Sequence, residues 1–124
     1  MIHLDTSFLI RSLDHNSIES VNLRAWLGGG ESVNMSTIAW SEFLCGPLPP
    51  DTAELAARLL SETVPFGEDE AEVASMLFNQ SGRRRGAMVD CMIAATALCR
   101  NVRLATSDLR DFERFEPHGL ILVR

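Results

Sequence analysis

Short apolar runs alternate with longer segments of helical spacing along the chain, and this alternation limits the folds open to it. Five short segments are predicted to be extended, most of them buried strands: 1–4, 32–35, 64–66, 102–105 and 120–123. The segments between them repeat their apolar residues at helical intervals: 6–13, 16–27, 36–45, 52–61, 68–81, 87–99 and 108–115. Strands that alternate with helices predict a three-layer α/β/α fold around a mostly parallel sheet of about four to five short strands.

The length of 124 residues is typical of one domain, so we expect residues 1–124 to form a single domain. No stretch reaches the roughly 18 apolar residues of a membrane helix, and no basic segment of a secretory signal opens the chain. Cys45, Cys91 and Cys99 form no CxxC pair. Their odd number and wide spacing argue against a disulfide framework or a zinc site and favour the reducing cytoplasm.

The charge of the chain excludes several classes of function. Seventeen acids stand against eleven bases, which gives a net charge of −6, and every base is arginine. The absence of lysine excludes Schiff-base chemistry, Walker A loops and phosphorelay receiver domains. An acidic chain is a poor non-specific ligand for nucleic acid, but bound divalent cations would weaken that objection.

Four acids lie where carboxylates are costly or well placed for a site. Asp5 and Asp108 follow predicted strands, Glu42 lies in a mostly apolar helix, and Asp90 opens a helix that is apolar almost all round. Each has an ordinary structural explanation: helix capping or a first-turn position for the three aspartates, and a buried ion pair with an arginine for Glu42.

Considered together, the acids point to a metal site. The carboxyl ends of parallel strands meet at one edge of a sheet, where ligands of α/β folds bind. Two carboxylates about 4 Å apart repel by about 4 kcal/mol at an effective dielectric constant of about 20. Carboxylate oxygens without histidine or cysteine suit Mg²⁺ or Mn²⁺, which activate water and stabilise charge on a phosphoryl group.

Four segments also carry a resemblance to a known family. They are Ile2-His3-Leu4-Asp5-Thr6-Ser7, the stretch from Ser36 to Gly46 with its acid four residues before the glycine, the stretch from Asp90 to Leu98, and the stretch from Ala105 to Phe112. In this order they resemble the PIN-domain ribonucleases over nearly the whole chain, and among these the VapC toxins of type II toxin–antitoxin pairs. The third segment is the most specific of the four.

The resemblance implies a metal-dependent endoribonuclease that acts as a toxin. One or two Mg²⁺ or Mn²⁺ ions would be held by four acids, with three hydroxyl residues in support: Asp5, Glu42, Asp90 and Asp108, and Thr6, Ser7 and Thr106. The resemblance also implies an RNA substrate, a homodimer and a small antitoxin partner. Asp111 competes with Asp108 for the fourth acid, and the spacing of 18 residues from Asp90 favours Asp108.

A cluster of three arginines precedes the third segment and has two possible roles. Arg83, Arg84 and Arg85 suit either substrate phosphates or a solvated helix end. His3 is expected to be a packed residue, and Trp26 and Trp40 to belong to the core or an interface. A PIN-like domain that binds RNA without cutting it, and a DNA-directed or structure-specific nuclease with the same acids, are the alternative functions.

Overall fold

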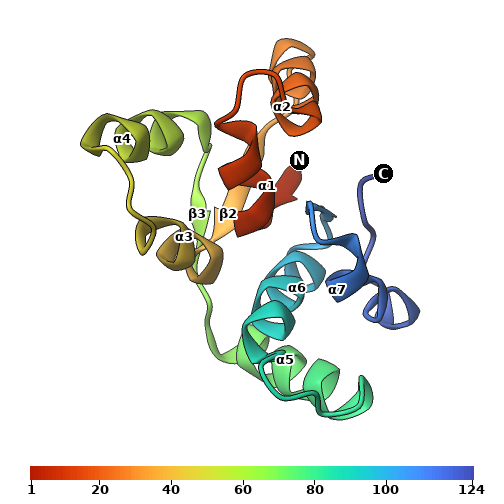
Figure 1. Ribbon diagram of the computed structural model, residues 1–124. Coiled ribbons are helices and arrows are strands. Elements are labelled where there is room, and N and C mark those ends of the chain that lie inside the picture. Colours follow the sequence, from red (N-terminus) through yellow and green to blue (C-terminus); the bar gives the residue numbers. More distant parts are fainter.

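The computed structural model describes residues 1–124 and contains four strands and seven α-helices (Figure 1). In chain order the elements are β1 (Ile2–Leu4), α1 (Thr6–Ser12), α2 (Ile18–Gly28), β2 (Val33–Ser36), α3 (Thr37–Leu44), α4 (Pro50–Leu59), β3 (Thr63–Val64), α5 (Glu68–Gln80), α6 (Met88–Arg100), β4 (Arg103–Ala105), α7 (Leu109–Glu113) and a 3₁₀ helix (Glu116–His118).

The strands form one sheet in the order β3-β2-β1-β4, and all its pairs are parallel. Helices flank this sheet: α5 and α6 pack together at one end of the molecule, while α1 packs against α2 and α3 (Figure 1). The predicted three-layer α/β fold is therefore confirmed. None of the helices combines the length and the apolar composition that a membrane crossing requires.

The predicted strand at 120–123 is wrong as a full strand, because only an isolated bridge joins Leu122 to Leu104. Leu104 makes both backbone hydrogen bonds on this edge: its N–H donates to Ile121 O, and its C=O accepts from Val123 N–H, both at 2.9 Å. In a parallel strand, alternate residues turn their backbone groups to opposite edges. Because β4 has only three residues, Leu104 alone turns its backbone groups toward the segment at 120–123, and only one bridge forms.

The strand order creates a switch point between β1 and β4. From β1 the chain adds β2 and then β3 on one side, and it returns through α5 and α6 to place β4 on the other side of β1. Leu4 pairs with Ala105, and the N–H of Asp5 donates to Ala105 O at 2.8 Å. Connections that leave two neighbouring strands in opposite directions open a crevice at their carboxyl ends, which is where α/β folds bind ligands.

The sheet is buried on both faces, which explains why β1 has no alternation of apolar and polar residues. His3 is 1% exposed, as expected of a packed residue, and burial, followed by the charge of Arg100, lowers its pKa to about 4. Trp26 and Trp40 pack against the core and stack on Phe8 and Phe43, with ring centroids 5.4 and 5.5 Å apart.

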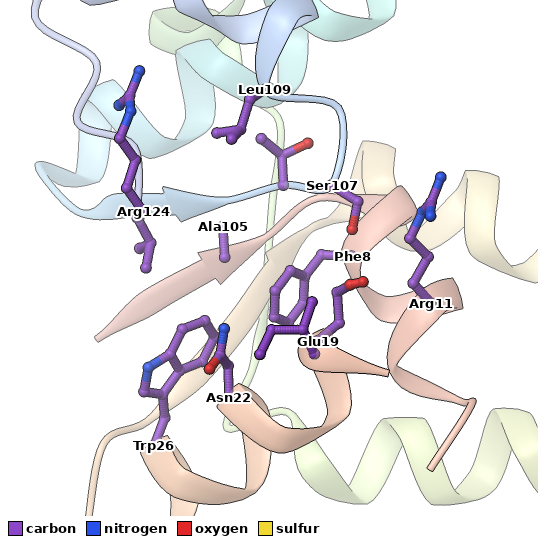
Figure 2. A pocket seen from close by; sticks show the side chains of 12 residues that line it. Phe8, Arg11, Glu19, Asn22, Trp26, Ala105, Ser107, Leu109 and Arg124 are labelled. Atoms are coloured by element: carbon purple, nitrogen blue, oxygen red, sulfur yellow. The ribbon is translucent and has the colours of Figure 1, made fainter. Parts of the chain in front are cut away.

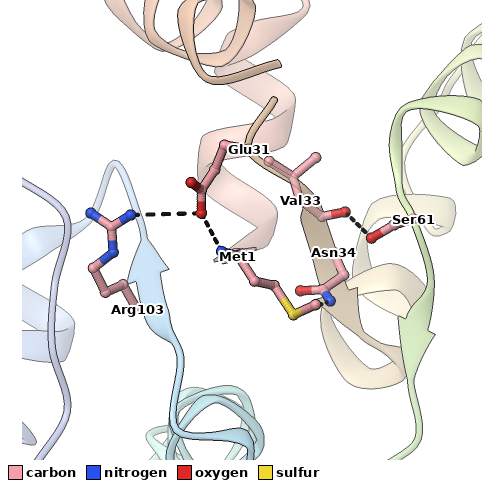
Figure 3. Close-up of polar contacts among 6 residues, drawn as sticks. All are labelled: Met1, Glu31, Val33, Asn34, Ser61 and Arg103. Atoms are coloured by element: carbon pink, nitrogen blue, oxygen red, sulfur yellow. Dashed lines mark hydrogen bonds and ion pairs between the residues drawn. The ribbon is translucent and has the colours of Figure 1, made fainter. Parts of the chain in front are cut away.

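Polar contacts tie the sheet together away from the crevice (Figure 3). Glu31 contacts the amino group of Met1 and lies 3.8 Å from the guanidinium of Arg103. Ser61 Oγ donates to Val33 O at 3.1 Å, just before β3 pairs with β2. These contacts join the beginnings of the strands, so the carboxyl ends are left as the open side of the sheet.

Helix starts are set by capping residues and proline. Ser36 ends β2 and caps α3, since its Oγ accepts a hydrogen bond of 3.0 Å from the N–H of Ala39. The helix predicted at 52–61 instead begins at Pro50, because proline is tolerated in a first helical turn, where its missing N–H has no acceptor to lose.

The cap of α3 gives a test of this packing. Ser36→Ala is expected to lower the free energy of unfolding by about 1 kcal/mol, because a buried N–H loses its acceptor. Urea denaturation measures the change. Ser41→Ala, an exposed position in the same helix, is the control and should change stability by less than about 0.5 kcal/mol. An equal loss in both variants would contradict the capping role.

Candidate active site

Asp5 directly follows β1 at the switch point of the sheet, and its side chain is fixed by two hydroxyl groups. The residue is 4% exposed. Ser7 Oγ and Thr106 Oγ1 donate to Asp5 Oδ2 at 2.7 and 2.8 Å. Asp5 occupies the N-cap position of α1, but its side chain accepts no capping hydrogen bond. The carboxylate is thus held across the end of the sheet toward β4, and the simple capping explanation does not account for it.

Burial raises the pKa of Asp5, because it removes water from the charged form. The hydrogen bonds from Ser7 and Thr106 act in the opposite direction, and the charge of Asp108 adds to the increase. Asp5 is therefore a buried carboxylate with good hydrogen bonds but no cation beside it.

Glu42 reaches the site through Thr6. Thr6 Oγ1 donates to Glu42 Oε1 at 2.9 Å and lies 3.1 Å from Ala39 O, so the hydroxyl joins α1 to α3. The expectation that Glu42 is buried is wrong, because the side chain is exposed and makes no ion pair with an arginine. The buried residues of α3 are Ala39 and Phe43. Glu42 directly precedes Phe43 and therefore lies on a neighbouring face of the helix.

Asp90 lies in the first turn of α6 with its side chain 31% exposed. Burial raises its pKa to about 6, and the charges of Asp5 and Asp111 add to the increase. Arg114 acts against them through an ion pair, with Nη2 3.6 Å from Asp90 Oδ2. Arg114 is not among the candidates identified from the sequence, because its contact with Asp90 depends on how α7 lies against α6.

The two candidates for the fourth acid occupy different sides of the site. Asp108 holds the N-cap position of α7 without a side-chain capping bond, its N–H donates to Thr106 Oγ1 at 3.0 Å, and its charge acts on Asp5. Asp111 is exposed, acts on Asp90 and lines a cavity with it. Asp108 thus acts on Asp5 and Asp111 on Asp90, so the electrostatics alone single out neither as the fourth acid.

The acids fit a hard divalent cation in chemistry but do not form a closed cage. No three His, Cys, Asp or Glu side chains come close enough together to hold a metal ion. The donors are carboxylate oxygens with hydroxyl support, which suits Mg²⁺ or Mn²⁺. Glu42, Asp108 and Asp111 are exposed, and like charges without a cation repel one another.

Two cavities lie at this end of the molecule, and only the smaller one is lined by candidate acids. The larger, about 340 Å³, lies between α1, α2 and the connection from β4 to α7, with Phe8, Trp26, Asn22 and Ser107 in its wall (Figure 2). The smaller, about 180 Å³, is lined by Arg84, Arg85, Gly86, Ala87, Asp90, Asp111 and Arg114.

The arginine cluster at 83–85 is divided by the structure. Arg84 and Arg85 line the smaller cavity with Asp90. Arg83 instead contacts Asn79 and lies over the ring of Phe78, 5.4 Å from its centroid. Only two of the three arginines proposed from the sequence therefore border the acidic site.

Comparisons with known proteins give one family and one fold. The PIN domain family matches residues 2–116, while a search of curated proteins gives no match. The structure of VapBC2 from Rickettsia felis, bound to a DNA fragment from its promoter, is 21% identical with a TM-score of 0.78, and covers 99% of this chain and 98% of that chain. A toxin–antitoxin complex from Klebsiella pneumoniae is 23% identical with a TM-score of 0.75, and covers 100% and 97%.

A third similar structure is VapC20 from Mycobacterium tuberculosis, described as a toxin that cleaves the sarcin-ricin loop. It is 19% identical with a TM-score of 0.70, and covers 100% of this chain and 99% of that chain. At such identities the likeness establishes a shared fold.

The raised pKa of Asp90 predicts how stability depends on pH. A carboxyl group whose pKa is raised in the folded state stabilises the fold when it is protonated. This contribution is lost as the pH rises from about 4 through about 6. In EDTA, Asp90→Asn is therefore expected to be more stable than the parent at pH 8, by about 1 kcal/mol after allowance for solvent screening, and the gain should disappear near pH 4.

Urea denaturation across this pH range measures the difference. Asp51→Asn is the matched control, because Asp51 also lies in the first turn of a helix but is exposed. If Asp90→Asn were the less stable protein at pH 8, the ionised carboxylate of Asp90 would not destabilise the fold, and this interpretation would be wrong.

Proposed function

This chain belongs to the PIN domain family, and we propose from that premise that residues 1–124 form a metal-dependent endoribonuclease domain. The observation that carries the proposal is the position of Asp5. Its carboxylate is buried at the switch point of the sheet, oriented by Ser7 and Thr106 and surrounded by further acids. Such a group is costly in a merely structural role, because no cation compensates it.

In this proposal the acids Asp5, Glu42 and Asp90, with Asp108 or Asp111, hold one or two Mg²⁺ or Mn²⁺ ions. When bound, a divalent cation makes a coordinated water more acidic and stabilises negative charge on a phosphoryl group. Ser7 and Thr106 set the orientation of the Asp5 carboxylate, and Thr6 does the same for Glu42 through its hydroxyl. The protein thereby supplies oriented carboxylate oxygens for the cation, and the phosphodiester would lie beside them.

The biological role that we propose is that of a toxin in a type II toxin–antitoxin pair. The shared fold with VapBC complexes and with VapC20 supports this role. We accordingly propose RNA as the substrate, a small antitoxin as the partner, a homodimer as the assembly and the cytoplasm as the location. The three cysteines are free, in keeping with that location.

Cleavage of RNA tests the activity. Purified protein free of antitoxin is incubated with total RNA in Mg²⁺ or Mn²⁺, in EDTA, and beside a DNA strand. We expect cutting of RNA that needs the metal and falls by at least about 100-fold in Asp90→Asn, with Asp51→Asn unchanged. Equal cutting of DNA would favour the alternative nuclease, binding without cutting would favour a binding domain, and cutting by Asp90→Asn would show that the site is wrong.

Metal binding is tested independently of activity by thermal stability. At pH 8, saturating Mg²⁺ is expected to raise the Tm of the parent protein, because a ligand that binds only the folded state stabilises it. A concentration of 100 times Kd corresponds to about 2.7 kcal/mol. The increase should be much smaller in Asp5→Asn and Asp90→Asn. An equal increase in parent and variants would place the cation elsewhere.

A further inference from the structure

A cationic wall borders the acidic crevice, although the chain carries a net charge of −6. The cavity of about 180 Å³ beside Asp90 is lined by Arg84 and Arg85, from the loop before α6, and by Arg114, which follows α7. Three guanidinium groups meet two carboxylates there, Asp90 and Asp111. The cavity thus has an excess of positive charge directly next to a carboxylate of the proposed active site.

Arg114 is the most constrained of the three arginines. Its side chain is 15% exposed, and its guanidinium lies over the ring of Phe115, 4.8 Å from the centroid. Phe115 is fully buried and packs edge-on against Phe112. The aromatic pair therefore holds the guanidinium in a set orientation, which an arginine needs for recognition of an anion by two parallel hydrogen bonds.

The donors of Arg114 are poorly used within the protein. Its Nε is buried without a hydrogen-bond partner. Its Nη2 lies 3.6 Å from Asp90 Oδ2, which is longer than a hydrogen bond. A buried donor without an acceptor is costly, so groups of the protein do not fully satisfy the guanidinium of Arg114.

Arg84 and Arg85 are also without partners. Neither makes an ion pair, whereas Arg58, Arg100 and Arg103 each lie within 4.0 Å of a glutamate. Both side chains are exposed at the mouth of the cavity that Arg114 closes from within. An anion in this cavity would meet two exposed guanidinium groups, those of Arg84 and Arg85, and the packed guanidinium of Arg114.

We propose that Arg84, Arg85 and Arg114 bind a backbone phosphate of the nucleic acid, adjacent to the phosphate that lies at the acids. The inference rests on the proposed function, since it assigns a substrate contact to the same site. A phosphodiester supplies the oxygen acceptors that the guanidinium groups lack, and it is the one group repeated along every strand. Arg114 sets where that phosphate lies, and Arg84 and Arg85 add charge at its outer side.

Binding of a strand without cleavage tests this contact. The affinity of a fluorescently labelled single-stranded RNA of about 12 nucleotides is measured in EDTA at several salt concentrations. We expect Arg114→Gln, and separately Arg84→Gln with Arg85→Gln, to raise Kd about tenfold and to flatten its dependence on salt. Arg58→Gln changes an exposed arginine that does not line this cavity, so it should leave the Kd and its salt dependence unchanged. A DNA strand of the same length should show the same losses, because its phosphates are alike.

A second pair of variants separates contact with phosphate from support of Asp90. In an Asp90→Asn background the ion pair with Arg114 no longer exists. If Arg114 acted only through Asp90, its substitution would then cause no further loss of RNA affinity. We expect Arg114→Gln to weaken RNA binding there as much as in the parent protein, and Arg114→Lys to recover only part of the loss. Disappearance of the effect in that background would overturn the proposal.

The outcome is distinguishable from failure of the proposed function. If the parent protein cuts RNA but binds it with equal affinity in all arginine variants, the phosphate contact is wrong and the nuclease stands. If nothing is cut but binding depends on the three arginines, the contact stands and the nuclease is wrong. Should Arg114→Gln fail to fold, the variant of Arg84 and Arg85 carries the test, since both side chains are exposed.

Discussion

The buried carboxylate of Asp5 is the constraint on which the site depends. A charge at this depth needs hydrogen bonds, and the structure draws them from Ser7 in α1 and from Thr106, which lies 101 residues further along the chain. These bonds, with that from Asp5 N–H to Ala105 O, join the ends of β1 and β4 at the point where the sheet changes direction. The fold and the site are thus secured by the same few contacts.

Electrostatics divides the crevice into two unlike surfaces. On one side, burial and mutual repulsion raise the pKa values of Asp5 and Asp90, so the acids favour a cation between them. On the other, the buried Nε of Arg114 has no acceptor, and Arg84 and Arg85 make no ion pair. A phosphodiester strand that crosses both, with a cation on the acids, meets opposite charge at each. In the proposed function, this arrangement would let an acidic protein bind an anionic polymer locally, without a positive surface overall.

The sequence predicts those features that depend on periodicity and on strand ends. The convergence of Asp5 and Thr106 is predictable because parallel strands deliver their carboxyl ends to one edge. Features decided by packing are not predictable in this way. The neighbouring face of α3, with Ala39 and Phe43, is the buried one, so Glu42 is exposed. The ion pair of Arg114 with Asp90 depends on how α7 lies against α6, for which the spacing of residues gives no direct signal.

The position of a bound cation decides whether these acids form a metal site. Crystals of the protein soaked in Mn²⁺ and measured at the manganese absorption edge locate the ion by its anomalous scattering. We expect a strong peak between the carboxylates of Asp5 and Asp90, with Glu42 and either Asp108 or Asp111 turned inward. A peak bound by other residues, or none at saturating Mn²⁺ with the crevice open to solvent, would contradict it.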